Sequence, residues 1–356
     1  METPQTNTTS SSNEEDALGR FHYLKKFSPW CIDKIFWDNG SAIIKGWYYS
    51  SNSSAFAIRC NGVRPIRHDY FRRRKDLPRL FPFWKEGSNS GFECEFLSES
   101  GKPLVFQPEE DAPENEFLKS YYYLDNGLPI PPEKNIERVS GSTLRGAFLL
   151  EGYSAYRKIR HILETDLEVN LTSKTRILDW GCGCGRVSRY FVKENFPIWG
   201  ADVDPDNLSW SAANLGIDTI LLNPEPSGKL PNSSFDLVIG ISVMTHLDES
   251  LQLKWLDELY GTLAPGGYAL LSTHGISSAL RIFPENLFSE FLQSGFVDCG
   301  HNKILKEVVG QSEFYKDTFT SEEFVRKKWQ RAFQVVKVYE SIVGNNQDLV
   351  VLRKPN

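Results

Sequence analysis

One short segment constrains this chain more than any other: an apolar stretch that runs into three alternating glycines. Residues 177–180 (Ile-Leu-Asp-Trp) have the composition of a buried strand, and glycines follow at every second position within residues 181–185. Glycine permits a tight turn and lets the backbone approach a ligand at the carboxyl end of a strand. Because a helical pattern over residues 187–191 follows directly, the segment predicts the first unit of a parallel α/β sheet.

The spacing of these glycines differs from the spacing found in the glycine-rich turn of dinucleotide-binding enzymes. Those enzymes use Gly-x-Gly-x-x-Gly, whose third glycine lies one residue further on, and the spacing here argues against a nicotinamide-dependent oxidoreductase. Asp202 ends the next apolar stretch, about 20 residues after the turn, where a carboxylate can hold both hydroxyls of a ribose. Asp204, which precedes a proline, is expected to cap the following helix.

Apolar strands alternate with helical patterns from Thr175 onward, as they do in a parallel sheet covered by helices. Residues 141–356 are therefore predicted to form a Rossmann-like α/β domain with a sheet of seven strands. The expected strands are Arg176–Trp180, Pro197–Val203, Thr219–Leu222, Phe235–Ser242, Gly267–Ser272, Phe333–Tyr339 and Asp348–Arg353.

The first third of the chain has a different pattern. Short alternating strands separated by turn signals such as Asn61-Gly62 predict a small all-β, sandwich-like domain over residues 28–107. Its many Trp and Phe side chains are interpreted as the core of that domain, in preference to a surface that stacks on sugars. The polar residues 1–27 are expected to be a disordered tail, and residues 108–140, rich in Pro and Glu, to be a linker.

Charge and composition exclude several classes of protein. With 40 Lys and Arg against 46 Asp and Glu, the net charge is −6, so the chain lacks the basic field of a nucleic-acid binder. The basic run Arg72–Arg79 is interpreted as a solvated or ion-paired face, with a grip on a polyanion as the alternative. No apolar run approaches the roughly 20 residues of a membrane helix, and no secretory signal is evident, so a cytoplasmic location is expected. Cys182 and Cys184 supply only two ligands, and no metal site is expected.

Four segments of the second half, taken in order, resemble the class I S-adenosylmethionine-dependent methyltransferases. They are ILDWGCGCGR, GADVDPDNL, LPNSSFDLVIGISVMTHLDES and LAPGGYALLSTHG. The resemblance covers about residues 140–353 and looks closest to a bacterial subgroup whose fourth strand ends in Ser-Val-x-Thr-His-Leu. Members of that subgroup often accompany enzymes of surface-glycan synthesis, and the N-terminal β region is similar to accessory domains of such enzymes.

The resemblance implies S-adenosylmethionine as the cofactor. It assigns the methionine end to Asp179 and the backbone of Gly181 and Gly183, and the ribose to Asp202. Asn223 stands where the family usually contacts adenine through an Asp, so the hydrogen bonding of the base is expected to differ. The remaining contacts that it implies are Cys182, Gly185, Val203 and Ser242.

Two histidines follow the fourth and fifth strands, at the edge of the sheet where ligands bind. Imidazole titrates near neutral pH, so His246 or His274 could be the general base that deprotonates a hydroxyl, and His246 is favoured. The alternative is that each histidine only orders its loop through hydrogen bonds. The segment His301–Phe319 is interpreted either as a lid over the acceptor or as a simple connection.

Together these features predict an enzyme that methylates an oxygen of a sugar or glycan precursor, mainly by aligning the two reactants. The acceptor would be a small molecule or a glycan. The alternative is a non-catalytic scaffold that binds S-adenosylmethionine and is associated with polysaccharide synthesis. The sequence leaves open the identity of the acceptor, the oligomeric state and the role of the N-terminal domain.

Overall fold

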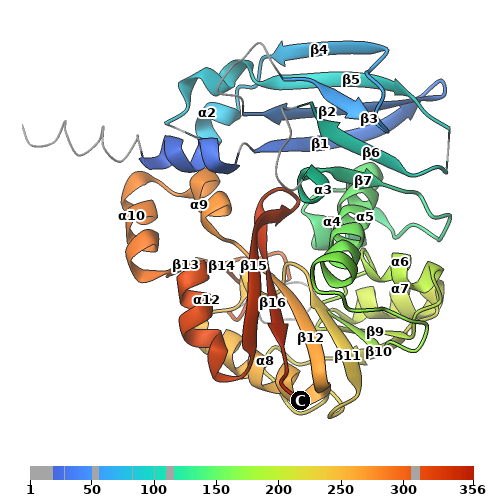
Figure 1. Cartoon of the computed structure of the whole chain (residues 1–356), viewed down its shortest axis with the longest axis vertical. Coiled ribbons are helices and arrows are strands. Elements are labelled where there is room, and N and C mark those ends of the chain that lie inside the picture. The colour runs from blue at the N-terminus through green and yellow to red at the C-terminus, as the bar shows by residue number, and fades with distance from the viewer. Residues whose placement is uncertain are drawn as a thin grey trace, which may run out of the picture.

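The structure is a computed structural model that describes residues 19–27, 29–49, 56–81, 83–99, 101–109, 116–305 and 313–356. A small β domain lies at the top of the view in Figure 1, and a larger α/β domain lies beneath it. Of the tail that was expected to be disordered, residues 1–18 lie outside the described residues. Residues 19–27 form a helix, so the expectation is wrong for this part of the tail.

The α/β domain is built on a sheet of seven strands in the order β10-β9-β8-β11-β12-β16-β15. Neighbouring strands from β10 to β12 are parallel, whereas β16 is antiparallel to both β12 and β15. Each strand lies where the sequence predicts one. The strands are β8 (Ile177–Trp180), β9 (Ile198–Asp202), β10 (Asp218–Leu221), β11 (Phe235–Gly240), β12 (Leu263–Thr273), β15 (Gln334–Val343) and β16 (Gln347–Arg353).

Helices cover both faces of this sheet, which explains why its strands are apolar at successive positions. Ile177 of β8 belongs to the hydrophobic cluster on one face and its neighbour Leu178 to the cluster on the other. Tyr156 of α5 packs in the first cluster and Trp255 of α8 in the second. The helices of this part are α5 (Arg145–His161), continued by a π-turn over Ile162–Asp166, α6 (Ser188–Lys193), α7 (Pro205–Leu215), α8 (Glu249–Thr262), α9 (Ile276–Ile282), α10 (Glu285–Ser294) and α12 (Glu322–Lys328).

Several shorter elements complete the α/β domain. Single 3₁₀ turns over Met244–His246 and Trp329–Arg331 follow β11 and α12. A separate antiparallel pair, β13 (Phe296–His301) and β14 (Lys316–Thr320), lies beside the main sheet. Strand β14 runs next to the 3₁₀ turn after β11, and this contact positions part of the site described below.

The N-terminal β domain consists of two antiparallel sheets that share one hydrophobic core. The ring of Tyr48 stacks on Phe56 with centroids 3.7 Å apart, and Phe96 meets Phe106 across the two sheets at 5.7 Å. The rings of Trp30, Trp47 and Trp84 are also buried, so these three tryptophans serve as core residues, whereas Trp37 is half-buried. The elements are β1 (Trp30–Asp38), β2 (Ser41–Tyr48), β5 (Gly91–Leu97) and β4 (Arg67–Arg72) in one sheet, β3 (Ile58–Cys60), β6 (Leu104–Pro108) and β7 (Tyr121–Tyr123) in the other, with α2 (Leu77–Leu80) and a 3₁₀ turn over Lys85–Asn89 between β4 and β5.

The segment 108–140 is structured where it is described, in contrast to the linker that its composition suggests. It contains the short helix α3 (Glu116–Lys119), strand β7, which pairs with β6, and helix α4 (Glu133–Ser140). The backbone N–H of Tyr122 donates to Ser154 Oγ of α5 at 2.8 Å, and this hydroxyl donates back to the Tyr122 carbonyl at 3.1 Å. The segment therefore joins the second β sheet directly to the α/β domain.

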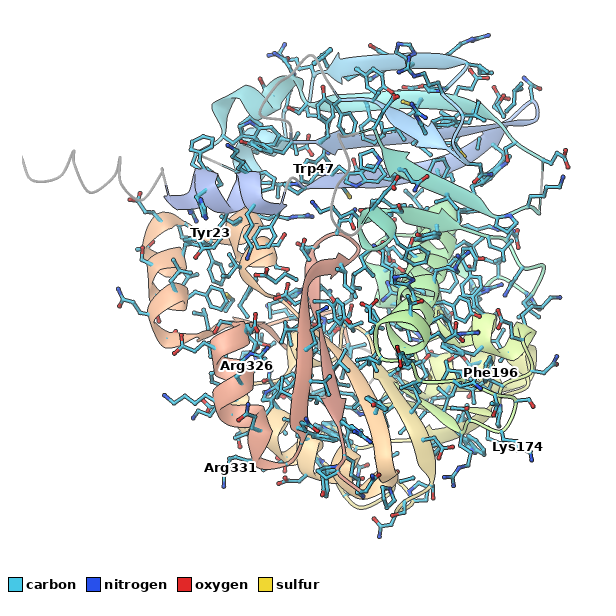
Figure 2. The ribbon with its side chains drawn as sticks, in the orientation of Figure 1. Tyr23, Trp47, Lys174, Phe196, Arg326 and Arg331 are labelled. Carbon is cyan, nitrogen blue, oxygen red and sulfur yellow. The ribbon has the colours of Figure 1, made fainter. Side chains whose placement is uncertain are left out.

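The helix over residues 19–27 extends the contact between the two domains. Arg20 lies over the rings of Phe83 and Phe288, 5.0 and 4.7 Å from their centroids. Tyr23, labelled in Figure 2, meets the ring of Phe288 of α10 edge-on at 6.1 Å. The guanidinium of Arg281 of α9 lies 5.2 Å from the ring of Trp47, which comes from the β domain. Both domains thus contribute aromatic rings and cations to one interface.

Two cations of the basic run Arg72–Arg79 form ion pairs, whereas Arg73, Lys75 and Arg79 are exposed to solvent. Arg72 pairs with Glu93 at 2.9 Å and with Asp69 at 2.8 Å. Arg74 pairs with Asp33 and Asp76, each at 2.6 Å. Within the described ranges, no helix is long and apolar enough to cross a membrane.

The core of the β domain yields a stability prediction. Phe106 is fully buried on the central strand of its sheet, so Phe106→Ala is expected to lower the free energy of unfolding by about 3–5 kcal/mol in urea denaturation. The control is Leu97→Ala, because that side chain is 73% exposed, and its effect should stay within about 0.5 kcal/mol. Equal losses for the two variants would contradict the shared core.

Candidate functional site

A pocket opens at the carboxyl ends of β8, β9 and β11, where parallel α/β sheets bind their ligands. It encloses about 970 Å³ of space between atoms, its open mouth included. Residues 179–183 form one wall, residues 202–204 a second and residues 241–243 a third. Arg138 of α4 and Tyr315, just before β14, close the sides.

The turn after β8 lines this pocket, and two of its positions, Gly181 and Gly183, have no space for a side chain. Gly181 and Gly183 have φ angles of +73° and +52°. A Cβ atom on Gly181 would lie 2.2 Å from Val243 Cγ2, and one on Gly183 would lie 2.5 Å from Val139 Cγ2. The backbone N–H groups of Gly181 and Cys182 donate to the Ala201 carbonyl at 2.7 and 3.2 Å. These two donors are therefore used inside the protein, and the turn offers a ligand a close approach to its backbone.

The third glycine serves packing, in contrast to the cofactor contact that the sequence implies. Gly185 has a φ of +74°, and a Cβ atom there would lie 2.2 Å from Leu215 Cδ1 of α7. It is absent from the lining of the pocket, whereas Cys182 lines it as a buried free thiol. Gly185 thus has the helix-packing role that the third glycine has in dinucleotide-binding turns.

Asp202, at the end of β9, is held with both carboxylate oxygens oriented. The N–H of Gly183 donates to Oδ2 at 2.7 Å, and the N–H of Asp204 donates to Oδ1 at 2.9 Å. Each carboxylate oxygen can accept about two hydrogen bonds, so the carboxylate keeps capacity to accept from a ligand. This arrangement suits a pair of neighbouring hydroxyls. Burial raises the pKa of the Asp202 carboxyl to about 6.

Asp179 is a second buried carboxylate of the same pocket, at 3% exposure. The hydroxyl of Ser188, at the start of α6, donates to its Oδ2. Burial raises the pKa of the Asp179 carboxyl to about 6, and the charge of Asp202 adds to this rise. Because the two acids disfavour each other's ionisation, the pocket favours a ligand that carries positive charge.

Asp204 has the capping role expected from the sequence. It is the N-cap of α7, where its Oδ1 accepts from the N–H groups of Asp206 and Asn207 at 3.0 and 3.1 Å. The guanidinium of Arg138 binds its other oxygen through Nε at 2.7 Å. This ion pair is nearly buried and attaches α4 to the edge of the pocket.

The residue predicted to contact adenine, Asn223, does not line the pocket. The side chain of Asn223 is exposed and lies outside the pocket lining, where it binds Ser227 and Lys229. Its neighbours Leu222 and Pro224 line the pocket instead. An apolar wall, without an amide, therefore faces the region where a base would lie.

Val203 and Ser242, two further expected contacts, do line the pocket. Ser242 has a φ of +63° at the end of β11. Its N–H donates to Ser272 Oγ at 2.7 Å, and its hydroxyl exchanges hydrogen bonds with the amide of Gln347 at 3.1–3.2 Å. The strained turn is thus fixed from two neighbouring strands.

His246 lines the pocket from the 3₁₀ turn after β11. Its Nδ1 lies 2.8 Å from the carbonyl oxygen of Lys316. A carbonyl can only accept, so Nδ1 carries the proton and the neutral ring keeps its lone pair on Nε2. The ring stacks on Tyr315 with centroids 4.1 Å apart, and only 16% of the side chain is exposed.

His274 follows β12 as predicted, but its side chain does not line the pocket. It is absent from the pocket lining and lies behind His246, with ring centroids 6.3 Å apart. Its Nδ1 donates to the Thr318 carbonyl at 3.2 Å. Burial lowers the pKa of the His274 imidazole to about 4, and the nearby His246 adds to this shift. The structure thus favours an ordering role for His274 over the general base.

Several residues that line the pocket were not site candidates from the sequence. Arg138 lies in the presumed linker, and Arg186 follows the glycine turn, where it pairs with Glu151 at 2.6 Å. Tyr315 lies in the segment interpreted as a lid or connection, and burial raises the pKa of its phenol. Leu305 and Phe314 from the same segment also line the pocket, and residues 306–312 between them lie outside the described residues.

The comparisons with known proteins agree with this geometry. A family model described as a methyltransferase domain matches residues 150–305. Residues 150–305 therefore match a methyltransferase domain, for which the sequence implies S-adenosylmethionine as the cofactor. In the described part of the chain, no cluster of His, Cys, Asp or Glu could hold a metal ion.

Individual relatives are distant. The Bacillus subtilis protein YqeM, provisionally named a methyltransferase, is 24% identical over 129 residues, which are 35% of this chain and 52% of YqeM. The chain thus spans about half the length of this relative. A crystal structure of an S-adenosylmethionine-dependent methyltransferase from Mesorhizobium loti is 18% identical, with a TM-score of 0.42, over 57% of this chain and 98% of its own. The 1,6-didemethyltoxoflavin N1-methyltransferase of Burkholderia thailandensis is 15% identical, with a TM-score of 0.39, over 67% of this chain and 96% of its own.

The residues present fit this cofactor. Asp202 presents two oriented carboxylate oxygens that would suit the two ribose hydroxyls, and residues 179–183 line the pocket beside it. Asp179 and Asp202 supply negative charge for the ammonium and sulfonium groups of S-adenosylmethionine. Leu222, Pro224 and Val203 line the pocket and would give the adenine an apolar wall.

A first prediction separates the two expected polar contacts. Asp202→Ala is expected to weaken binding of S-adenosylmethionine by about 1–3 kcal/mol in calorimetric titration, because charge-assisted hydrogen bonds are lost. Asn223→Ala is the matched control and should leave the affinity unchanged, since its side chain lies outside the pocket. The reverse order of effects would show that the ribose assignment is wrong.

A second prediction concerns pH. The pKa values of Asp179 and Asp202 lie above the ordinary 3.8, so between about pH 4 and 6 the folded protein binds more protons than the unfolded chain. These groups therefore lower the stability of the free protein as the pH rises through that window. Cofactor affinity should change in the opposite direction, rising from pH 5 to pH 7, because the ionised carboxylates attract the cationic ligand. Calorimetry across this range checks the sign, and a flat affinity profile would contradict it.

Proposed function

We propose that this protein methylates a hydroxyl oxygen of a sugar or glycan precursor, with S-adenosylmethionine as the methyl donor. The observation that carries the proposal is the position of His246. Its ring lines the cofactor pocket, and its hydrogen bond to the Lys316 carbonyl leaves Nε2 as the proton acceptor. A base at this place is what a neutral alcohol needs before it can attack a methyl group.

The cofactor supplies an electrophilic methyl group, which an acceptor oxygen takes while the sulfur keeps the electron pair of the broken bond. The chain's own contribution is alignment and proton transfer. Asp202 orients the ribose end, and the glycine turn sets the depth of the site. His246 accepts the hydroxyl proton on Nε2 and becomes an imidazolium. Solvent can remove this proton later, since 16% of the side chain is exposed.

The class of acceptor rests on two supports. The neutral imidazole suits an alcohol, and alcohols of this kind are abundant on sugars. The segment Ser242–Leu247 and the N-terminal β domain resemble those of enzymes that accompany glycan synthesis. The acceptor is expected at the pocket that His246 lines.

A third prediction tests His246. His246→Gln keeps a side-chain N–H donor for the Lys316 carbonyl but removes the proton acceptor, so turnover should fall by about 10²-fold or more. The cofactor dissociation constant should stay within a factor of about two, because the assigned binding contacts are elsewhere. His68→Gln, at an exposed position on β4, is the control. Retained turnover with a lowered melting temperature would show that His246 is structural.

The acceptor is tested with methyl-labelled cofactor and a panel of nucleotide sugars and glycan fragments. Label in an O-methyl group, located by mass spectrometry and NMR, supports the proposal. Label on nitrogen only would overturn the acceptor class. Saturable cofactor binding without turnover on the whole panel would favour the alternative, a non-catalytic scaffold in polysaccharide synthesis.

A further inference from the structure

We propose that Asp317 is a positioning residue for methyl transfer, which acts through His246 and stabilises the imidazolium that proton transfer creates. The inference rests on the proposed function, because it concerns the base assigned there. Asp317 is the residue after Lys316, whose carbonyl binds the same imidazole nitrogen. Strand β14 thus presents a carbonyl oxygen and a carboxylate to one edge of the ring.

The geometry supports a paired charge at this edge. Asp317 Oδ1 lies 3.4 Å from His246 Nδ1 and accepts a hydrogen bond from Asn302 at 3.1 Å. The contact with His246 holds the pKa of the Asp317 carboxyl below its usual range, so the group is ionised at neutral pH. A proton taken up on Nε2 would create a cation whose other nitrogen already faces this carboxylate.

The position of Asp317 is fixed by contacts of β14 with the turn that carries His246. The hydroxyl of Thr318 donates to the carbonyls of Met244 and Leu247, both at 3.1 Å. Gln252 of α8 donates to the same two carbonyls at 3.0 and 3.2 Å. The histidine turn and the strand therefore form one hydrogen-bonded unit, with little freedom for the ring to separate from the carboxylate.

The other charged or titratable groups around His246 do not take this role. They are Tyr315 and Lys316 on the approach to β14, His274 after β12 and Asp248 at the start of α8. His274 is neutral at neutral pH, since burial lowers its pKa to about 4, and burial raises the pKa of the Tyr315 phenol. The ammonium of Lys316 is paired with Asp298 at 2.6 Å and Asp248 at 3.4 Å. Among the described groups, Asp317 is the anion in contact with the ring.

The first arm of the test reads the tautomer without any turnover. Nitrogen-15 NMR of the neutral imidazoles, with His246→Gln to assign the signal, should show the proton of His246 on Nδ1. The hydrogen bond to Lys316 predicts the same tautomer in Asp317→Asn, since the carbonyl remains. A proton on Nε2 in the wild-type protein would overturn the inference whatever the activity.

The second arm measures kcat against pH at saturating cofactor, so that titration of Asp179 and Asp202 in the free pocket does not enter. Asp317→Asn should lower kcat about tenfold and move the acidic limb of the profile to lower pH, because the half-exposed carboxylate no longer faces the charged ring. Asp317→Glu should restore part of both. Asp298→Asn, which removes an acid on the far side of Lys316, is the matched control and should leave the limb in place.

The outcomes are distinguishable. If kcat falls in Asp317→Asn while the acidic limb stays where it is, Asp317 has only a structural role and the inference is wrong. If the wild-type protein shows the predicted tautomer but methylates no hydroxyl, the proposed function is wrong, and this result differs from the one that rejects the role of Asp317.

Discussion

The hydrogen bond from the Gly183 N–H to the Asp202 carboxylate is the interaction on which the site depends. It connects the turn after β8 to the end of β9, two neighbouring strand ends that both line the pocket. The bond requires a backbone that curls back on itself, which Gly183 adopts at a φ of +52°. The same bond fixes the orientation of the Asp202 carboxylate, which lines the pocket. A single contact therefore shapes both the loop and the ligand-binding edge.

A second set of contacts organises the opposite side of the pocket. Two carbonyl groups of β14, those of Lys316 and Thr318, each accept from the Nδ1–H of a histidine. His246 and His274 thus have the same tautomer but different surroundings, because one lines the pocket and the other is buried behind it. Burial separates two residues that follow equivalent strand ends. The difference between a candidate base and an ordering residue is therefore one of environment rather than of residue type.

The parts of this structure that were predictable are those encoded by local pattern. The seven strands, the glycine turn and the cap at Asp204 follow from apolar runs, glycine spacing and an Asp-Pro step, each within a few residues. The exposed side chain of Asn223 could not be foreseen, because the direction of a side chain after a strand ends is set by the path of the backbone. Arg138, β7 and the contact between His246 and Lys316, 70 residues apart, depend on pairings between distant segments, which leave no periodic signal in either partner.

The shared helix α5 has a consequence for how this protein can be divided. Its Phe148 and Leu149 lie in the hydrophobic core of the β domain, whereas Tyr156 and Ile159 of the same helix lie in the core beneath the seven-stranded sheet. Even Cys184 of the glycine turn belongs to the β domain's cluster. A polypeptide begun at residue 141 would expose these side chains to water and leave Ser154 without the backbone of Tyr122. The N-terminal part is thus not a separable module, because the helix that carries the α/β core also completes the core of the β domain.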